Sequence, residues 1–375
     1  MNSLSEKSFN PGLRVVAMGG GTGLSTLLRG LKQRIENPTS LASRRIHLLA
    51  PYILDLTAIV AVTDDGGSSG RLRIDFGMLA PGDLRSYMIA LAEDEHHLSR
   101  LFRHRFRAEG GLAGHSFGNL FIAALMEMTG SFGQAIQLAG EVLSIRGRIL
   151  PVTAINATLV AIMEDGALVR GETKINASRK RIAEVRLEPE LVPAPINTLE
   201  AIARADLITI GPGSLYTSIV TNILVQGIPE ALADTSATRV YITNLMTEPN
   251  ESLGLSVSEH IERIYEHAGR AIFDYAMVNT GPISEVVRGR YAAEGAEPTK
   301  VDLERIEAMG IGCICGDFVA DGKSLRHASD QVAEVLLALK RVALSQRSES
   351  VSGVAWGIPR SGSQAYIPLE EGTAL

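Results

Sequence analysis

The stretch Arg14–Lys32, RVVAMGGGTGLSTLLRGLK, determines how the N-terminal half of the chain is interpreted. It begins with a short, β-branched apolar run, which is typical of a buried strand. Four glycines then fall within five residues, and leucines follow at helical spacing. The order strand, glycine loop, helix is the first half of a βαβ unit.

The glycine loop indicates a binding site for an anion. Glycines allow a tight turn and leave backbone N–H groups uncovered at a helix N-terminus, where the helix dipole favours a phosphate. No Gly-Lys-Ser/Thr follows, so the loop is not a Walker motif, and the spacing of a dinucleotide fingerprint also fails. A tight turn without ligand is the alternative. The candidate residues are Gly19, Gly20, Gly21, Thr22 and Gly23.

Composition narrows the class of protein. The 375 residues are 45% hydrophobic and 21% charged, which suits a globular protein of one large or two ordinary domains. A net charge of −6 argues against a general nucleic-acid binder. We expect no membrane span and no signal peptide, and therefore a cytoplasmic protein. The two cysteines, Cys313 and Cys315, are expected to be buried core thiols rather than metal ligands.

Strands and helices alternate along most of the chain. Apolar runs at 56–62, 206–211, 239–244, 273–279 and 311–319 have the composition of buried strands. Their alternation with helical patterns predicts an α/β fold with a mostly parallel sheet and helices on both faces.

Three regions depart from this alternation. Residues 149–190 suggest paired strands, with a hairpin turn at 164–166, and we interpret them as a β-rich insertion. Residues 37–55 resemble a variable insertion. The expected organisation is a disordered N-terminus at 1–12, an α/β domain at 13–345 and a flexible tail at 346–375.

Acidic and small polar residues follow the second predicted strand in TDDGGSSGRLR, residues 63–73. Ligands of open α/β sheets bind at this carboxyl edge, near a switch in strand order. Two adjacent carboxylates could take sugar hydroxyls or Mg²⁺, and the following loop supplies donors and a cation. A solvated turn is the alternative. The candidates are Asp64, Asp65, Ser68, Ser69 and Arg71.

Further candidates lie at later helix starts and strand ends. Asp83 is a predicted N-cap, and His115 and Asn119 precede an apolar helix in GHSFGNL. The arginines of HLSRLFRHRFR are expected to form a solvated face. A second strand, glycine turn and helix occur in ITIGPGSLYTSI, followed by another strand end. These two contribute Gly211, Gly213, Ser214 and Asn244.

Taken together and in this order, the segments resemble a known family. GGGTGLSTLLRGLK, AVTDDGGSSGRLR, PGDLRS, GHSFGNL, ITIGPGSLYTSI, TNLMTEPNESLG and LRHASDQVAEVLL are similar to the YvcK family of bacterial gluconeogenesis factors, relatives of the CofD-type 2-phospho-L-lactate transferases. The likeness spans about residues 13–340. It implies a CofD-like, Rossmann-type fold and a cytoplasmic protein that binds a UDP-sugar such as UDP-N-acetylglucosamine. It also implies a regulatory role in carbon metabolism, cell shape and peptidoglycan precursor supply.

The resemblance adds two residues and one departure. Tyr291 and Arg326 lie in stretches similar to the family's nucleotide-sugar contacts, where a ring can stack and a guanidinium can clamp a diphosphate. In LRHASD, Ala-Ser stands where the family tends to have an acid after the histidine.

Two function classes follow, a non-catalytic UDP-sugar-binding regulator and a Mg²⁺-dependent transferase of a phospho-lactyl-type group. The first is favoured because the chain shows no unambiguous nucleophile or base. An NAD-dependent dehydrogenase is less favoured because the fingerprint fails. A homodimer is expected by analogy alone.

Overall fold

The computed structural model describes residues 12–36, 52–93, 97–107, 109–178, 180–320, 322 and 324–351. The N-terminal segment, most of the predicted insertion at 37–55 and the chain beyond Val351 lie outside these residues. No helix in the described part is long and apolar enough to cross a membrane.

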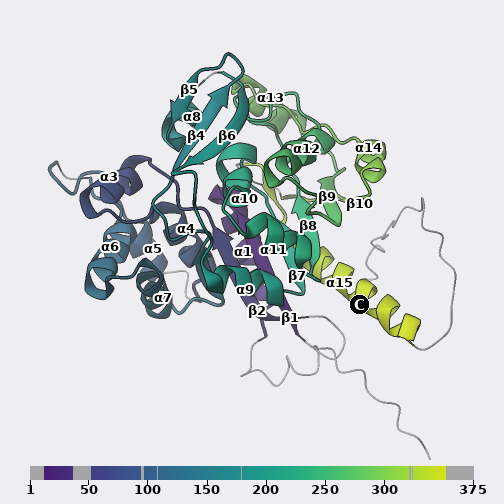
Figure 1. The fold of residues 1–375 in the computed structure, drawn as a ribbon, viewed down its shortest axis with the longest axis horizontal. Helices are drawn as coiled ribbons and strands as arrows, with labels where there is room; N and C mark the ends of the chain where they lie inside the picture. Colours follow the sequence, from purple (N-terminus) through teal and green to yellow (C-terminus); the bar gives the residue numbers. More distant parts are fainter. Residues whose placement is uncertain are drawn as a thin grey trace, which may run out of the picture.

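A seven-stranded parallel sheet forms the centre of the molecule (Figure 1). The strand order is β10-β9-β8-β7-β1-β2-β3. Its strands are β1 (Leu13–Gly19), β2 (Ile53–Val60), β3 (Arg148–Pro151), β7 (Leu207–Ile210), β8 (Thr238–Ile242), β9 (Tyr275–Asn279) and β10 (Gly312–Gly316). The five predicted apolar runs and the first strand are all confirmed. They were recognisable because strands covered on both faces are continuously apolar.

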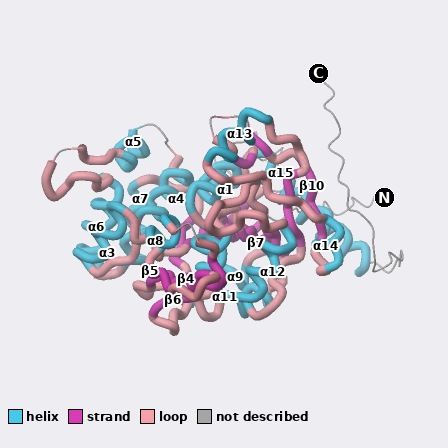
Figure 2. The backbone as a smooth tube through the Cα atoms, turned by 90° about the horizontal axis from the view of Figure 1, so that it is seen from above, coloured by secondary structure: helices cyan, strands magenta, loops and turns pink. Residues whose placement is uncertain are grey.

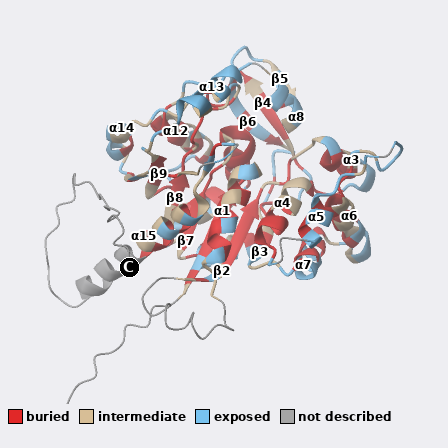
Figure 3. Ribbon diagram, turned by 180° about the vertical axis from the view of Figure 1, so that it is seen from behind, coloured by how far each residue is buried: buried red, intermediate tan, exposed pale blue. Residues whose placement is uncertain are grey.

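Helices cover both faces of the sheet, and each face has its own apolar core. In Figure 3 the central strands are buried and the outer helices carry the exposed residues. One face packs against α1 (Gly21–Gln33), α4 (Gly82–Leu91), α6 (Phe117–Thr129), α7 (Phe132–Val142) and α15 (Ser329–Val351). The other packs against α9 (Ile196–Arg204), the π-helix η1 (Leu215–Val220), α10 (Thr221–Ile223), α11 (Ile228–Asp234), α12 (Val257–Ala268) and α14 (Leu303–Ala308).

A small antiparallel sheet stands at one end of the main sheet (Figures 1 and 2). It consists of β4 (Thr158–Met163), β5 (Leu168–Arg170) and β6 (Ile182–Glu188), with α8 (Glu172–Ala177) beside it. The predicted β-rich insertion and its hairpin are confirmed. The start of that range needs correction, because Arg148–Pro151 pairs in parallel with β2 and forms the edge of the main sheet.

The remaining elements are α3 (Gly67–Phe76), α5 (His97–Arg103), α13 (Glu285–Ala293), β11 (Val319–Ala320) and β12 (Arg326–His327). Two helices, α3 and α15, differ from expectation. The expected loop after the second strand is in fact the first turn of α3. Helix α15 continues to Val351, past residue 346, where the sequence suggests a tail. Cys315 is exposed and Cys313 half-buried, because β10 is an edge strand.

The strand order reverses between β1 and β7. From β1 the chain builds outward to β2 and β3, and from β7 it builds the other way to β8, β9 and β10. Loops that leave neighbouring parallel strands in opposite directions open a crevice at the carboxyl edge. The two glycine loops of the sequence follow these two strands.

Candidate functional site

The two glycine loops meet at the switch point. Gly211 donates its N–H to Met18 O at 2.7 Å, and Asn222 Nδ2 donates to Gly19 O at 3.2 Å. A Cβ on Gly23 would lie 2.9 Å from Pro212 O, so only glycine permits this approach. At Gly21 the backbone has φ +57°, and a Cβ would meet nothing within 4 Å. The direction away from the protein at Gly21 is therefore open to a ligand.

A cavity of about 190 Å³ lies over the loops, and we call it the switch-point cavity. Residues from five separate segments line it, so the fold brings together side chains that are distant in sequence. The predicted residues among them are Gly20, Gly21, Thr22, Gly23, Gly213, Ser214, Asn244, Tyr291 and Arg326. Glu248 and His327, which the candidate set lacks, line it as well.

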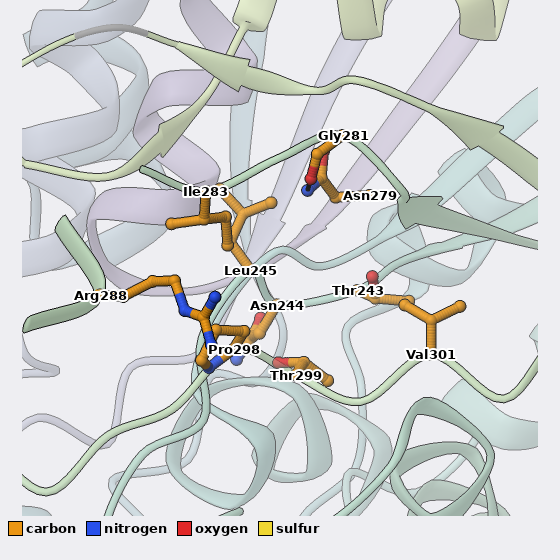
Figure 4. A pocket seen from close by; sticks show the side chains of 10 residues that line it. All are labelled: Thr243, Asn244, Leu245, Asn279, Gly281, Ile283, Arg288, Pro298, Thr299 and Val301. Atoms are coloured by element: carbon orange, nitrogen blue, oxygen red, sulfur yellow. Dashed lines mark hydrogen bonds between the residues drawn. The ribbon is translucent and has the colours of Figure 1, made fainter. Parts of the chain in front are cut away.

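A second cavity of about 250 Å³ adjoins the first through Asn244 and Leu245. It lies beyond the ends of β8 and β9, and we call it the β8–β9 cavity. Polar side chains share its wall with aliphatic ones, and Arg288 extends from α13 toward them (Figure 4). Thr299 Oγ1 is buried there without a hydrogen-bond partner among the described residues. These groups suit a flat polar ring better than a purely apolar ligand.

A third cavity of about 310 Å³ opens at the N-terminus of α3. We call it the serine cavity. The predicted residues that line it are Asp64, Ser68, Ser69, Asp83 and Asn119. Arg85 and Arg105, absent from the candidate set, also line it. Ser68 and Ser69 lie in the first turn of α3, and a Cβ on Gly70 would lie 2.0 Å from Asp65 O, so only glycine fits at that position.

Five predicted residues line none of these cavities. Asp65 accepts hydrogen bonds from Thr173 N at 2.8 Å and Thr173 Oγ1 at 2.7 Å. Arg71 donates to Ala113 O at 2.6 Å. His115 Nδ1 is 2.9 Å from Ser68 Oγ, and burial, followed by the charge of Arg71, lowers its pKa. Gly19 is the last residue of β1, and Gly211 directly follows β7.

Asp83 connects the serine cavity to the switch-point cavity. Its Oδ2 accepts the N–H of Gly21 at 3.4 Å and the hydroxyl of Tyr87 at 3.2 Å. Burial, and then the charge of Asp64, raises the pKa of Asp83. Burial also raises the pKa of Glu172 well above its usual range, and the charges of Asp64 and Asp83 add to this effect. The acidic groups here therefore repel one another.

Asp64 and Asp65 do not face each other. Asp64 Oδ1 accepts the N–H of Gly66 at 2.9 Å, while Asp65 is turned to Thr173. In the described part of the chain, no group of three or more His, Cys, Asp or Glu side chains is placed to hold a metal ion. Asp64 and Asp83 are the acidic pair that shares a cavity.

The second glycine loop is filled by a carboxyl group of the protein itself. Glu251 Oε2 accepts the N–H groups of Tyr216 at 2.7 Å and Thr217 at 3.2 Å, and its Oε1 accepts Thr217 Oγ1 at 2.7 Å. Burial, with Glu248 as a charged neighbour, raises the pKa of Glu251 to about 7. The donors at the start of η1 are thus occupied by the protein itself, whereas those of α1 face a cavity.

Fold and site define an α/β protein with a glycine-lined crevice at its topological switch point. The family described as 2-phospho-L-lactate transferase CofD matches residues 15–319. A gluconeogenesis factor of Halalkalibacterium halodurans is 44% identical over 324 residues, covering 86% of this chain and 95% of that protein. The gluconeogenesis factor of Bacillus subtilis is 40% identical over 327 residues, covering 87% and 98%. A crystal structure of a Bacillus halodurans protein, 43% identical, superposes with a TM-score of 0.80 and covers 87% of this chain and all of that one.

The chain therefore belongs to the CofD-like family, in its YvcK group of gluconeogenesis factors. The recognition made from the sequence motifs is confirmed, and so is the Rossmann-type α/β fold.

Proposed function

We propose that this protein is a cytoplasmic regulator that binds a nucleotide sugar of the UDP-N-acetylglucosamine type, and that it links carbon metabolism to cell shape and cell-wall precursor supply. The observation that supports it best is the open face of the first glycine loop. Gly21 presents backbone without a side chain to the switch-point cavity, at a helix N-terminus that favours phosphate.

The rest of the ligand is assigned from the side chains around that loop. Arg326 lies in the same cavity and can clamp a diphosphate, and Tyr291 can stack on a base or sugar. Thr299 and Asn244 in the adjoining β8–β9 cavity can hydrogen-bond to a base. Burial lowers the pKa of His327 to about 4, so near neutral pH this imidazole is an uncharged hydrogen-bonding group.

The test is calorimetric titration with UDP-N-acetylglucosamine, with and without Mg²⁺, on the wild type and two glycine variants. Gly21→Ala places a methyl group in the ligand's approach and should weaken binding at least about tenfold, or about 1.4 kcal/mol. Gly77→Ala is the matched control. Gly77 has φ +61° and also has open space at its Cβ, so both variants carry about 1–2 kcal/mol of backbone strain.

Gly77 ends α3 and is not among the residues that line the switch-point cavity. Equal affinity in Gly21→Ala and wild type would mean that the first loop serves only the turn. Equal losses in both variants would attribute the effect to stability rather than to the site. Light scattering in the same samples tests the homodimer, which stays a prediction.

A transferase is the second candidate, because the matching family is described as one and because carboxylates with raised pKa gather beside the glycine loop. Mass spectrometry of the nucleotide sugar after incubation with the protein distinguishes the regulator from the transferase. Recovery of intact nucleotide sugar supports the regulator. Mg²⁺-dependent release of nucleotide supports the transferase.

A further inference from the structure

The serine cavity has a positively charged side. The first N–H groups of α3 lack partners within the helix, and they favour an anion. Arg85 and Arg105 line the cavity, and Arg85 Nε is buried without a hydrogen-bond partner among the described residues. Burial, and then the charge of Arg105, lowers the pKa of Arg85, so an anion between these guanidinium groups would relieve their repulsion.

This positive side continues outward. A crevice of about 420 Å³ adjoins the serine cavity at Arg105, and four further basic side chains line it, namely Arg100, Arg103, His104 and Arg107. No ion pair joins these arginines to an acidic residue within the described part of the chain. In a protein of net charge −6, this local concentration can guide an anionic ligand toward the cavity.

The serine cavity also contains hydrogen-bond acceptors. His115, Ser68 and Asn119 form a chain in which Asn119 Nδ2 donates to Ser68 Oγ at 3.1 Å. Burial, and then the charge of Arg71, lowers the pKa of His115, which favours the neutral imidazole, and in that form Nδ1 can accept the Ser68 hydroxyl proton. Asn119 Oδ1 is then left as an acceptor, and it is buried without a partner while the residue is only 1% exposed.

The carboxylates of Asp64 and Asp83 add acceptors beside Asn119. Hydroxyl groups are the donors that these oxygens can take without placing a further charge in the cavity. A ligand that satisfies the basic groups and the acceptors therefore carries an anionic group and several hydroxyls.

We propose that the serine cavity is a second ligand site, separate from the nucleotide cavity, and that it binds a phosphorylated polyol such as a sugar phosphate. The phosphate lies at the N-terminus of α3 between Arg85 and Arg105. The hydroxyls donate to Asn119, Asp64 and Asp83. Because Asp83 also contacts Gly21, occupancy of one site alters affinity at the other, and this coupling is reciprocal.

The experiment is calorimetric titration of the full chain with glycerol 3-phosphate, ribose 5-phosphate and glucose 6-phosphate. Titration with inorganic phosphate measures the affinity for the phosphate part alone, and titration with glucose measures the affinity for the polyol part alone. Each titration is run in the absence of a nucleotide sugar and in the presence of saturating UDP-N-acetylglucosamine. At least one sugar phosphate should bind about tenfold more tightly than phosphate or glucose, and should still bind when the nucleotide sugar is present.

Arg105→Gln should weaken that binding about tenfold, as expected for loss of one charge-assisted hydrogen bond. Arg107→Gln removes the same charge from a residue that lines only the outer crevice, and should change affinity by less than threefold. Thermal unfolding verifies that both variants fold.

The proposal is overturned if none of the three phosphates binds, or if the two variants weaken binding equally. It is also overturned if the nucleotide sugar competes with the sugar phosphate, since both would then share one site. Because the titrations without nucleotide sugar stand alone, failure here is distinct from failure of the proposed nucleotide site.

Discussion

The two glycine loops have the same sequence pattern, but their backbone N–H groups have different acceptors. Each follows a central strand, and each precedes a helical segment whose first N–H groups need acceptors. In the second loop Glu251 accepts two of these groups, at 2.7 and 3.2 Å, and is 6% exposed. In the first loop Asp83 accepts one group at 3.4 Å, beside a cavity. A glycine turn before a helix thus predicts a hydrogen-bond acceptor for the first N–H groups, but not whether the acceptor is a ligand or a side chain.

The largest expected effect is on the internally filled loop. Glu251→Ala should lower the free energy of unfolding at pH 6 by about 3 kcal/mol, because it leaves two buried N–H groups without acceptors. Urea unfolding measures this change. Glu251→Gln is the control, since its amide oxygen can accept both groups. If alanine and glutamine give the same stability, Glu251 is not the acceptor that η1 needs.

The contrast between the loops also shows which features the sequence predicts. It predicts the parallel strands and the sheet edge at which the cavities lie, because buried strands are continuously apolar and parallel strands end together. It does not predict the buried position of Glu251, since TEPNES carries no period or motif that indicates a buried carboxylate.

The start of α3 was missed for a related reason. Its glycines and serines have low intrinsic helix propensity, and tertiary contacts override that preference. The candidate set lacks Arg85, and the sequence predicts a solvated face for Arg105, because only the folded chain brings these arginines to Ser68 and Asn119. The sequence thus locates the glycine loops, but it does not identify all of the side chains that fill them or line the cavities.

A pH dependence should accompany the filled loop. The pKa of Glu251 is raised to about 7 in the folded protein, above an unfolded value near 4.5. The folded state therefore binds more protons between these values, and this group makes stability fall as pH rises from about 4.5 to about 7. The loss is about 3 kcal/mol. Unfolding measured across this range should show it in wild type, and Glu251→Gln should lack that component. A wild-type profile identical to that of Glu251→Gln would show that Glu251 ionises freely.

The smallest expected effect concerns the open loop. Asp83→Asn keeps an oxygen that can accept from Gly21 and Tyr87, so the free energy of unfolding should change by less than about 1 kcal/mol. It removes a negative charge beside the proposed diphosphate position. Affinity for UDP-N-acetylglucosamine should therefore rise about three- to tenfold, and this gain should depend only weakly on salt because the charge of Asp83 is partly buried and screened little.

Calorimetry at two salt concentrations measures the change. Glu248→Gln is an informative partner variant, since Glu248 also lines the switch-point cavity but holds Ser214 of the second loop, with Ser214 Oγ donating at 3.0 Å. A gain confined to Asp83→Asn would place the diphosphate on the first loop. A loss of affinity in Asp83→Asn would instead make Asp83 a direct ligand of a sugar hydroxyl or a cation, and the first loop would then resemble the second in relying on a carboxylate.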